Sequence, residues 1–398
     1  MEQLGVVGKP NVGKSTFFAA ATLAPAQIAN YPFTTIEANR GVGFVKSKCP
    51  HMDFQLQCTP RNSRCEDGVR FVSVEMIDVA GLVPGAHEGK GMGNKFLDDL
   101  RQANALIHVV DASGCTDAEG NVCPDGSRDP LDDVRFLESE IDQWMAGILG
   151  KGWERMAKRT EAESIKVETI LAEKYAGLGM TESDIKLALK MAPVPEKFHK
   201  WTQEDLLMFA SALRKQSKPM IIAANKADMA PPEKMQRLRE MDGYIVIPTA
   251  SEYELGLRRA AKAGLINYIP GAREFSIVDP SKLNPAQKKG LDKVAEFLAK
   301  SEAGTGVQNC VEQAFFKLLD MLVVYPVEDE GKLTDKDGRV LPDAFLLKRG
   351  STAKDMAFKV HTDLGQKFIR AINARTKRVI GHDYILQDGD VIKIVAGA

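Results

Sequence analysis

Near its first residue the chain reads Leu4-Gly5-Val6-Val7, then Gly8-Lys9-Pro10-Asn11-Val12-Gly13-Lys14-Ser15-Thr16, then Phe17-Phe18-Ala19-Ala20-Ala21. The first run predicts a buried strand and the last a helix, with a glycine-containing loop between them. The loop fits the pattern G-x-x-x-x-G-K-[ST], whose backbone N–H groups hold phosphate oxygens at a helix N-terminus. In that pattern Lys14 reaches the β- and γ-phosphates and Ser15 ligates Mg²⁺. We therefore expect an α/β nucleotide-binding domain built on a P-loop.

Two later segments fit the switch elements of such a domain. In Asn30-Tyr31-Pro32-Phe33-Thr34-Thr35-Ile36-Glu37, Thr35 is expected to close over Mg²⁺ and the γ-phosphate, with Thr34 as the alternative. The alternative is an ordinary turn-forming loop whose hydroxyl groups have no functional role, because such a loop can have the same residue types. A predicted strand over residues 69–77 then leads into Asp78-Val79-Ala80-Gly81. Asp78 would hold the Mg²⁺ shell, and Gly81 would offer its N–H to the γ-phosphate.

Base recognition is predicted at Asn225-Lys226-Ala227-Asp228, which follows an expected strand over residues 219–224. The Asp228 carboxylate can accept hydrogen bonds from both N1–H and the 2-amino group of guanine, which adenine does not present together. The Asn225 amide can meet the acceptor edge of the ring. After a further expected strand, residues 244–248, the backbone of Thr249-Ala250-Ser251 could meet guanine O6. These segments predict a guanine nucleotide as the ligand.

The sequence identifies the residue that activates water for hydrolysis less clearly than it identifies the nucleotide-binding motifs. Leu82 follows the D-x-x-G motif, where Ras-like proteins keep a glutamine that positions water, and leucine cannot orient water. Asn11 could help bind K⁺ between the α- and γ-phosphates, and His87 could swing inward to orient the water. Lys14, Asn11 and His87 are therefore the expected catalytic residues. The alternatives are that Asn11 only bonds within its loop and that His87 faces solvent.

Composition sets broad limits on the protein. The 398 residues suggest two or three domains, with 44% hydrophobic and 27% charged residues as in ordinary soluble proteins. The net charge of −1 means that nucleic-acid binding would require a local basic patch. No apolar run is long enough to span a bilayer, so we expect a cytoplasmic protein without membrane contact.

Cysteine usage points to thiols or metal ligands instead of disulfides, because six cysteines are too few for a disulfide scaffold. Cys49, His51, Cys58 and Cys65 fall in one loop of little apolar content. Three thiols and an imidazole suit a tetrahedral Zn²⁺ site. Their spacing is not the usual paired C-x₂-C, so free thiols on a variable loop are the alternative.

Three domains are expected from the change in pattern along the chain. Residues 1–129 and 217–322 form the P-loop domain with a mainly parallel sheet, and residues 130–216 form a helical insertion with an antiparallel pair. The patterns Thr181-Glu182-Ser183-Asp184 and Thr202-Gln203-Glu204-Asp205 predict capped helix starts there. Residues 252–322 are expected to be helical. Residues 323–398 form a small α+β domain with strands at 344–347, 379–380 and 391–395, a helix at 352–363 and a shorter one around Phe368.

The terminal domain also carries a basic cluster beside two aromatic residues, namely Lys367, Arg370, Arg375, Lys377 and Arg378 beside Phe368 and Tyr384. Lysine and arginine displace counterions from a phosphate backbone, and an exposed aromatic ring can stack on an unpaired base. The cluster thus fits RNA, although a solvated charged face is the simpler alternative.

The P-loop together with residues 30–37, 78–87 and 91–97 closely resembles the Obg family of GTPases, specifically its YchF-type branch. The resemblance covers nearly the whole chain. Residues 350–355, 361–364 and 386–392 look like that family's C-terminal TGS domain, a ubiquitin-like β-grasp module. In the family this module follows a P-loop domain with a helical, coiled-coil-like insertion. The resemblance implies cytoplasmic association with ribosomes or translation.

One departure from the family concerns the base. Many YchF-type proteins carry glutamate in place of the guanine-reading aspartate and prefer ATP, whereas this chain has Asp228. We therefore expect a GTPase that uses Mg²⁺ and acts as a nucleotide-dependent switch. An ATPase of the same fold and a non-hydrolysing guanine-nucleotide sensor are the alternatives.

Overall fold

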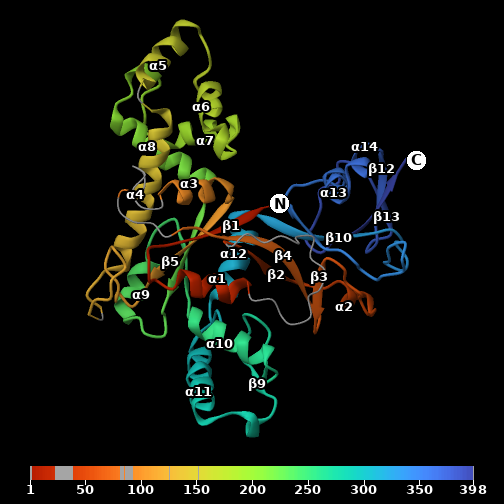
Figure 1. The fold of residues 1–398 in the computed structure, drawn as a ribbon. Helices are drawn as coiled ribbons and strands as arrows, with labels where there is room; N and C mark the ends of the chain where they lie inside the picture. Colours follow the sequence, from red (N-terminus) through yellow and green to blue (C-terminus); the bar gives the residue numbers. More distant parts are fainter. Residues whose placement is uncertain are drawn as a thin grey trace. The chain divides into compact units, whose positions relative to one another are not determined.

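The computed structural model describes residues 2–22, 39–80, 85, 93–124, 126–150 and 152–397 (Figure 1). The chain divides into two compact units. The first comprises Met1–Leu23, Ala38–Gly41 and Glu75–Cys310, and the second comprises Ala24–Glu37, Val42–Val74 and Val311–Ala398. Among the described residues, none of the helices combines the length and the apolar character needed to cross a membrane.

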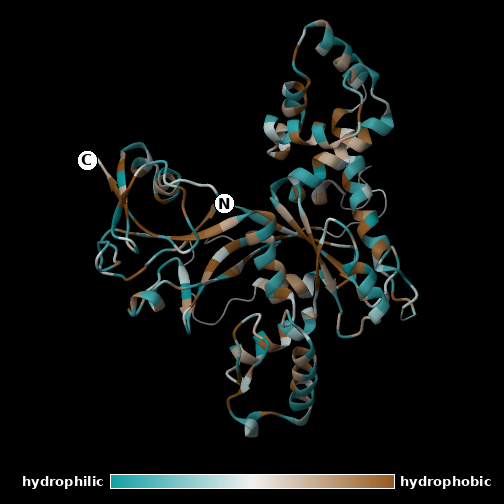
Figure 2. Cartoon of the chain, turned by 180° about the vertical axis from the view of Figure 1, so that it is seen from behind, coloured by the Kyte–Doolittle hydropathy of each residue, from teal (hydrophilic) through white to brown (hydrophobic). Residues whose placement is uncertain are grey.

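A parallel sheet forms the centre of the first unit. Its strands are ordered β4-β1-β5-β6-β7, with bounds β1 Gln3–Val7, β4 Val69–Asp78, β5 Ala105–Asp111, β6 Met220–Asn225 and β7 Ile245–Pro248. Every residue of β5 and β6 is buried, as expected for parallel strands covered on both faces. Figure 2 shows these central strands in the brown of hydrophobic residues. The register pairs Val6 with Asp78 and Asp111 with Asn225, so that the strands end along one edge.

Helices accompany these strands, and the helix expected directly after the P-loop is present as α1, but one region differs from the sequence expectation. Their bounds are α1 Lys14–Thr22, α3 Gly93–Gln102, α9 Pro232–Arg239, α10 Ser251–Lys262, α11 Pro285–Lys300 and α12 Val307–Gln313. The expectation of helix throughout residues 252–322 was wrong, because β8 (Ile266–Asn267) and β9 (Ser276–Ile277) pair as a short hairpin and β10 begins at Met321. Strands of two residues are too short to show the alternation that marks a strand in sequence.

The helical insertion contains α4 (Pro130–Leu149), α5 (Trp153–Ala162), α6 (Val167–Tyr175), α7 (Glu182–Met191) and α8 (Gln203–Ser217). The predicted capping boxes at the starts of α7 and α8 are both present. The helices α4 and α8 form the expected antiparallel pair. Arg214, near the end of α8, bonds to Glu138 (2.8 Å) and Asp142 (2.6 Å) in the middle of α4. Gln203 and Leu206, at the start of α8, line one pocket with Gly147 near the end of α4. The apolar core of the insertion continues into that of the sheet.

The second unit contains a mixed sheet of order β11-β10-β14-β12-β13, the arrangement of a β-grasp fold. The bounds are β10 Met321–Val327, β11 Phe345–Lys348, β12 Phe368–Asn373, β13 Arg378–Ile380 and β14 Val391–Ala396, with helices α13 Ala353–Val360 and α14 Thr362–Gln366. The short helix expected around Phe368 was wrong, because Phe368 begins β12. This strand pairs with both β13 and β14, and these tertiary contacts override the local pattern.

The same unit includes a hairpin from the middle of the nucleotide-binding sequence. Its elements are β2 (Arg40–Lys48, in this unit from Val42), α2 (His51–Phe54), β3 (Ser63–Glu66) and the first part of β4. The strand β3 pairs antiparallel with β4, from Ser63 opposite Val72 to Glu66 opposite Val69. The loop with the clustered cysteines is thus part of the same compact unit as the β-grasp domain.

Candidate nucleotide-binding site

The P-loop has the backbone that an anion cradle needs. Gly8, Asn11 and Gly13 all have positive φ, and the helix α1 starts directly afterwards with a bond from Phe17 N to Gly13 O (2.8 Å). A Cβ on Gly13 would lie 2.3 Å from Asn225 Nδ2, so only glycine fits at this position. The first N–H groups of α1 have no partner within the helix and are suited to phosphate oxygens.

Two side chains that the sequence assigned to phosphate and Mg²⁺ lie together. Lys14 Nζ forms an ion pair with Asp78 Oδ1, at the end of β4. Ser15 is exposed in the first turn of α1, and Thr16 beside it is half-buried. A hydroxyl and a carboxylate are oxygen ligands of the type that Mg²⁺ takes. The lysine, the hydroxyl and the carboxylate therefore suit a Mg²⁺-bound polyphosphate.

Asn225 links the predicted base-reading motif to the P-loop. Its Nδ2 donates to Val12 O (2.8 Å), and its Oδ1 accepts from Ser251 N (3.1 Å) and Ser251 Oγ (2.8 Å). Both lone pairs of the amide oxygen are thus used within the protein, and one N–H of the amide is left for the base.

The next residue of the motif, Lys226, is held by a buried carboxylate. Its Nζ lies 2.8 Å from Oδ2 of Asp111, and this oxygen also accepts from Thr116 Oγ1 (3.0 Å). The other oxygen, Oδ1, accepts from Ser113 N (3.1 Å). Burial acts to raise the pKa of Asp111, but the ion pair with Lys226 and the hydrogen bonds outweigh it and keep the pKa below its ordinary value. The sequence interpretation missed Asp111, although an aspartate that ends a strand otherwise apolar except for His108 was a usable signal.

Asp228 is exposed and lines an open pocket together with Ala227, Met229 and Tyr253. Burial, reinforced by the neighbouring Asp228 carboxylate, raises the pKa of the Tyr253 hydroxyl. The carboxylate is therefore placed to accept hydrogen bonds from a ligand that enters this pocket.

The Thr249-Ala250-Ser251 segment is held more tightly than the sequence indicated. The N–H groups of its three residues donate to Ala224 O (2.9 Å), Thr305 O (2.8 Å) and Asn225 Oδ1 (3.1 Å), respectively. A backbone contact with guanine O6 would require one of these bonds to be exchanged.

The loop after β5 and the start of α4 support the P-loop from the side. Asn11 Nδ2 donates to Gly120 O (2.9 Å), and the buried Lys9 bonds to Thr116 O (2.9 Å) and Asp133 Oδ1 (2.7 Å). Burial raises the pKa of Asp133 to about 6 despite the neighbouring lysine. Because its nitrogen bonds to Gly120, Asn11 would bind a cation through its amide oxygen. The sequence interpretation missed Lys9 and Asp133.

Three predicted site residues, Thr35, Gly81 and His87, lie outside the described residues, as do Thr34 and Leu82.

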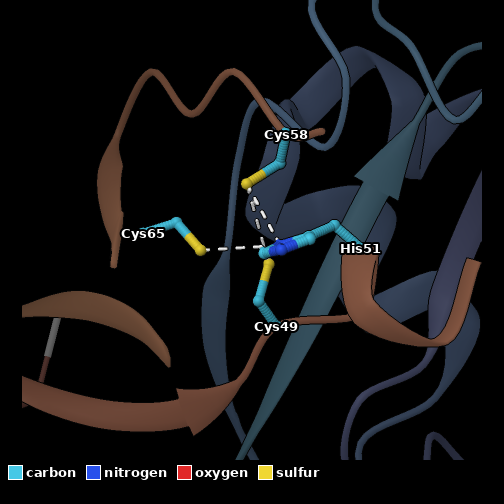
Figure 3. A group of neighbouring side chains, drawn as sticks. All are labelled: Cys49, His51, Cys58 and Cys65. Atoms are coloured by element: carbon cyan, nitrogen blue, oxygen red, sulfur yellow. Dashed lines mark hydrogen bonds between the residues drawn. The ribbon is translucent and has the colours of Figure 1, made fainter. Parts of the chain in front are cut away.

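The predicted metal ligands Cys49, His51, Cys58 and Cys65 do come together, with their ligand atoms all within 4.8 Å of one another (Figure 3).

The structure divides the basic cluster of the terminal domain. Arg375 pairs with Asp53 (2.9 Å), and Lys377 Nζ donates to Glu330 O (2.5 Å). Arg370 and Arg378 are exposed, but the register of β12 and β13 places them on opposite faces of the hairpin, because Arg378 opposes Asn373. The neighbouring aromatic rings, Phe368 and Tyr384, are half-buried, and the Tyr384 hydroxyl bonds to Asp390 Oδ2 (3.2 Å).

A phosphate cradle at a helix N-terminus and the Asn225–Asp228 loop tied to it, both at one edge of a parallel sheet, place the chain among the P-loop nucleotide-binding proteins. Family models agree with this class. They match residues 3–135 to the 50S ribosome-binding GTPases, residues 223–329 to the G4 motif-containing domain of YGR210-like Obg-like GTPases, and residues 332–396 to the TGS domain.

Individual relatives extend over the whole chain. An uncharacterised GTP-binding protein of Methanocaldococcus jannaschii is 56% identical, with 100% of both chains covered. A GTP-binding protein of Pyrococcus horikoshii has a crystal structure with 46% identity, a TM-score of 0.78 and 100% of both chains covered. The ribosome-binding ATPase YchF of Haemophilus ducreyi is 28% identical, with 98% of this chain and 97% of the relative covered. The chain belongs to the Obg family, in its YchF-type branch, and carries the C-terminal TGS domain of that family.

Proposed function

We propose that this protein binds GTP with Mg²⁺, hydrolyses it to GDP, and uses the two nucleotide states as a switch in its contact with the ribosome or RNA. The observation that carries the proposal is the position of Asn225. Its side chain bonds to the P-loop carbonyl of Val12, and Asp228 follows three residues later at an open pocket. One ligand with a base at Asp228 and phosphates at the P-loop fits this arrangement.

Guanine is favoured by the chemistry of Asp228. A carboxylate is an acceptor only, and guanine presents two adjacent donors where adenine presents an acceptor at N1. The ion pair between Lys226 Nζ and Asp111 Oδ2 (2.8 Å) positions the loop that carries Asp228. The Haemophilus ducreyi relative is named a ribosome-binding ATPase, so an ATPase of the same fold is the second candidate function.

Each residue of the site has its own proposed role in hydrolysis. Lys14 binds the β- and γ-phosphates, Ser15 and Asp78 hold Mg²⁺ together with Thr35, and Gly81 donates to the γ-phosphate. When bound, Mg²⁺ neutralises charge on the phosphate oxygens. Asn11 adds a K⁺ site through its amide oxygen, and His87 orients the attacking water. These roles build on the sequence pattern and on the proximity of Lys14 to Asp78.

The TGS domain is the proposed contact with the ribosome or RNA, which would place the protein in the cytoplasm. Support comes from the names of relatives, such as the ribosome-binding ATPase of Haemophilus ducreyi, and from the exposed Arg370 and Arg378. Because fold analogy is an associational argument, this part of the proposal needs its own test.

Nucleotide specificity is tested with the variant Asp228→Asn. The wild type should bind GTP and turn it over in preference to ATP. The variant should bind GTP roughly 100-fold more weakly and gain affinity for xanthosine triphosphate, whose changed edge suits an amide. Equilibrium binding of fluorescent nucleotides and phosphate release give both quantities. The exposed Asp242→Asn, in the turn after α9, is the matched control and should change neither.

The outcomes separate the candidate functions. Equal or tighter binding and turnover of ATP by the wild type would replace the GTPase with an ATPase. Binding of GTP without phosphate release would leave a guanine-nucleotide sensor.

A further inference from the structure

Four side chains near the turn between β2 and β3 point toward a common centre (Figure 3). Cys49 follows β2, His51 begins α2, Cys58 lies in the next loop, and Cys65 is in β3. The short helix α2 turns back at Gln55, whose φ is +53°, and the pairing of β3 with β4 positions Cys65. Residues from four local elements thus place three sulfur atoms and one imidazole nitrogen within 4.8 Å of one another.

Three of the six distances between these atoms match the edges of a zinc tetrahedron, and the others are within 4.8 Å. With Zn–S near 2.3 Å and Zn–N near 2.0–2.1 Å, tetrahedral angles require about 3.8 Å between sulfurs and about 3.6 Å between sulfur and nitrogen. Cys49 Sγ lies 3.9 Å from Cys58 Sγ, and His51 Nδ1 lies 3.3 Å from Cys58 Sγ and 3.5 Å from Cys65 Sγ. A disulfide requires about 2.05 Å between sulfurs, so the observed separation fits a shared ion better.

A buried cation beside the cluster supplies a second, independent argument. Arg70 is fully buried, and its Nη2 lies 3.3 Å from Cys49 Sγ. Its other hydrogen bonds are to Ser63 Oγ (2.9 Å) and Leu341 O (3.0 Å), and in the part of the chain that the structure describes no carboxylate pairs with it. Buried charges need a counter-charge. Three thiolates and a neutral imidazole around Zn²⁺ carry a net charge of −1, which balances the guanidinium.

We propose that Cys49, His51 through Nδ1, Cys58 and Cys65 form a structural Zn²⁺ site. The ion would fix residues 49–65, a segment that bonds to residues 340–344 of the TGS domain. Four protein ligands close the coordination sphere, which is the arrangement of structural and not of catalytic zinc. Arg70 is the outer-shell donor to the Cys49 sulfur.

The segment between the ligands Cys58 and Cys65 explains what the ion stabilises. Thr59 N and Arg61 N donate to the carbonyls of Val340 (2.9 Å) and Pro342 (2.7 Å). The Asn62 side chain donates to Ala344 O (3.1 Å) and accepts from Ala344 N (2.9 Å). Arg61 also forms an ion pair with Asp343. These contacts lie within the second unit. The ion would therefore hold the segment between Cys58 and Cys65 in the position that the contacts with residues 340–344 require.

The first experiment measures metal in protein purified without an affinity tag or chelator. Elemental analysis should give about one Zn²⁺ per chain, and Cys58→Ser should reduce this to roughly a tenth or less. Cys123→Ser removes a half-buried thiol outside the cluster and should keep the full zinc content. Replacement of Zn²⁺ by Co²⁺ should give the visible absorption of tetrahedral thiolate coordination in the wild type and in Cys123→Ser.

The second experiment uses wild-type protein and does not depend on a variant that folds. Removal of zinc by a chelator should lower the melting temperature and open residues 49–65 and 340–344 to proteolysis. Binding of fluorescent GTP should persist, which separates this proposal from the proposed function. Metal-free protein with the same melting temperature and protease resistance would overturn the zinc site. A Cys49–Cys58 disulfide, or zinc that is equally present in Cys58→Ser, would also overturn it.

Discussion

The side-chain amide of Asn225 donates a 2.8 Å hydrogen bond to the carbonyl oxygen of Val12, so the end of β6 is tied directly to the P-loop. Both groups are buried, and the same amide accepts two hydrogen bonds from Ser251. Asn225 therefore holds the start of residues 225–228, which are predicted to read the base, against the P-loop. The sequence motif predicted only a contact between this side chain and the base. Its hydrogen bonds to Val12 and Ser251 show that it also positions the P-loop against the end of β6.

Asn225→Ala should weaken GTP binding by roughly 10- to 100-fold, because it leaves buried partners unpaired at a cost of about 1–3 kcal/mol. Fluorescent GTP titration and thermal unfolding measure the affinity and the stability together. Asn284→Ala, which removes the side-chain cap of α11, should lower stability without changing GTP affinity. If both variants lose affinity in proportion to stability, Asn225 has only a structural role.

Much of this architecture could be predicted because periodicity and motifs reflect local forces. The strand expected at residues 219–224 agrees with β6 (Met220–Asn225) to within one residue, and the capping boxes of α7 and α8 follow from Thr and Asp at fixed spacing. Lys9, Asp133 and Asp111 were missed because their partners are distant in sequence, 124 residues away for Lys9 and Asp133. The strand at Phe368 was misread for the same reason, since its pairing with β14 is a tertiary contact.

The hydrolysis step should depend on the monovalent cation. If K⁺ sits against the Asn11 amide oxygen, replacing Na⁺ with K⁺ should raise GTP turnover, and Asn11→Ala should remove the difference. His87→Ala should lower turnover, by roughly 10²-fold or more for lost general acid–base assistance, without altering GTP affinity. Single-turnover phosphate release in both salts measures these effects. Unchanged turnover in His87→Ala would remove His87 from the mechanism.

Acid stability should reflect His108, which is buried on β5 opposite Val7 of β1. Burial lowers the pKa of His108 to about 3, and in the unfolded chain the pKa is about 6.5. The unfolded state therefore binds this proton first, so the stability present above about pH 6.5 is lost as the pH falls toward 3. At pH 5 the loss from this group is about 2 kcal/mol.

Denaturant unfolding at pH 7 and pH 5 tests this sign with His108→Gln, which cannot titrate in the range. Wild type should lose about 2 kcal/mol more than the variant between the two pH values. Equal losses in the two proteins would show that other groups control the acid transition.

The proposed contact of the TGS domain with ribosomes or RNA is best tested by substitution and not by truncation. A cut at residue 325 would divide β10 and would remove the partners of Arg70 and Arg61 at Leu341 and Asp343, and so disturb the rest of the second unit. Arg375 and Lys377 are engaged within that unit, with Asp53 and Glu330. The exposed Arg370 and Arg378 are the better targets.

Of Arg370→Glu and Arg378→Glu, the one on the RNA-binding face should weaken co-sedimentation with ribosomes or RNA, and removal of one phosphate contact should reduce the salt slope of binding by about one. Because the two arginines lie on opposite faces of the β12–β13 hairpin, a single RNA-binding face predicts that one substitution acts and the other does not. GTP affinity should stay at the wild-type value in both. Lys288→Glu on the exposed start of α11 is the charge-matched control. If neither arginine variant differs from this control, the contact lies outside the hairpin, and the helical insertion becomes the next surface to test.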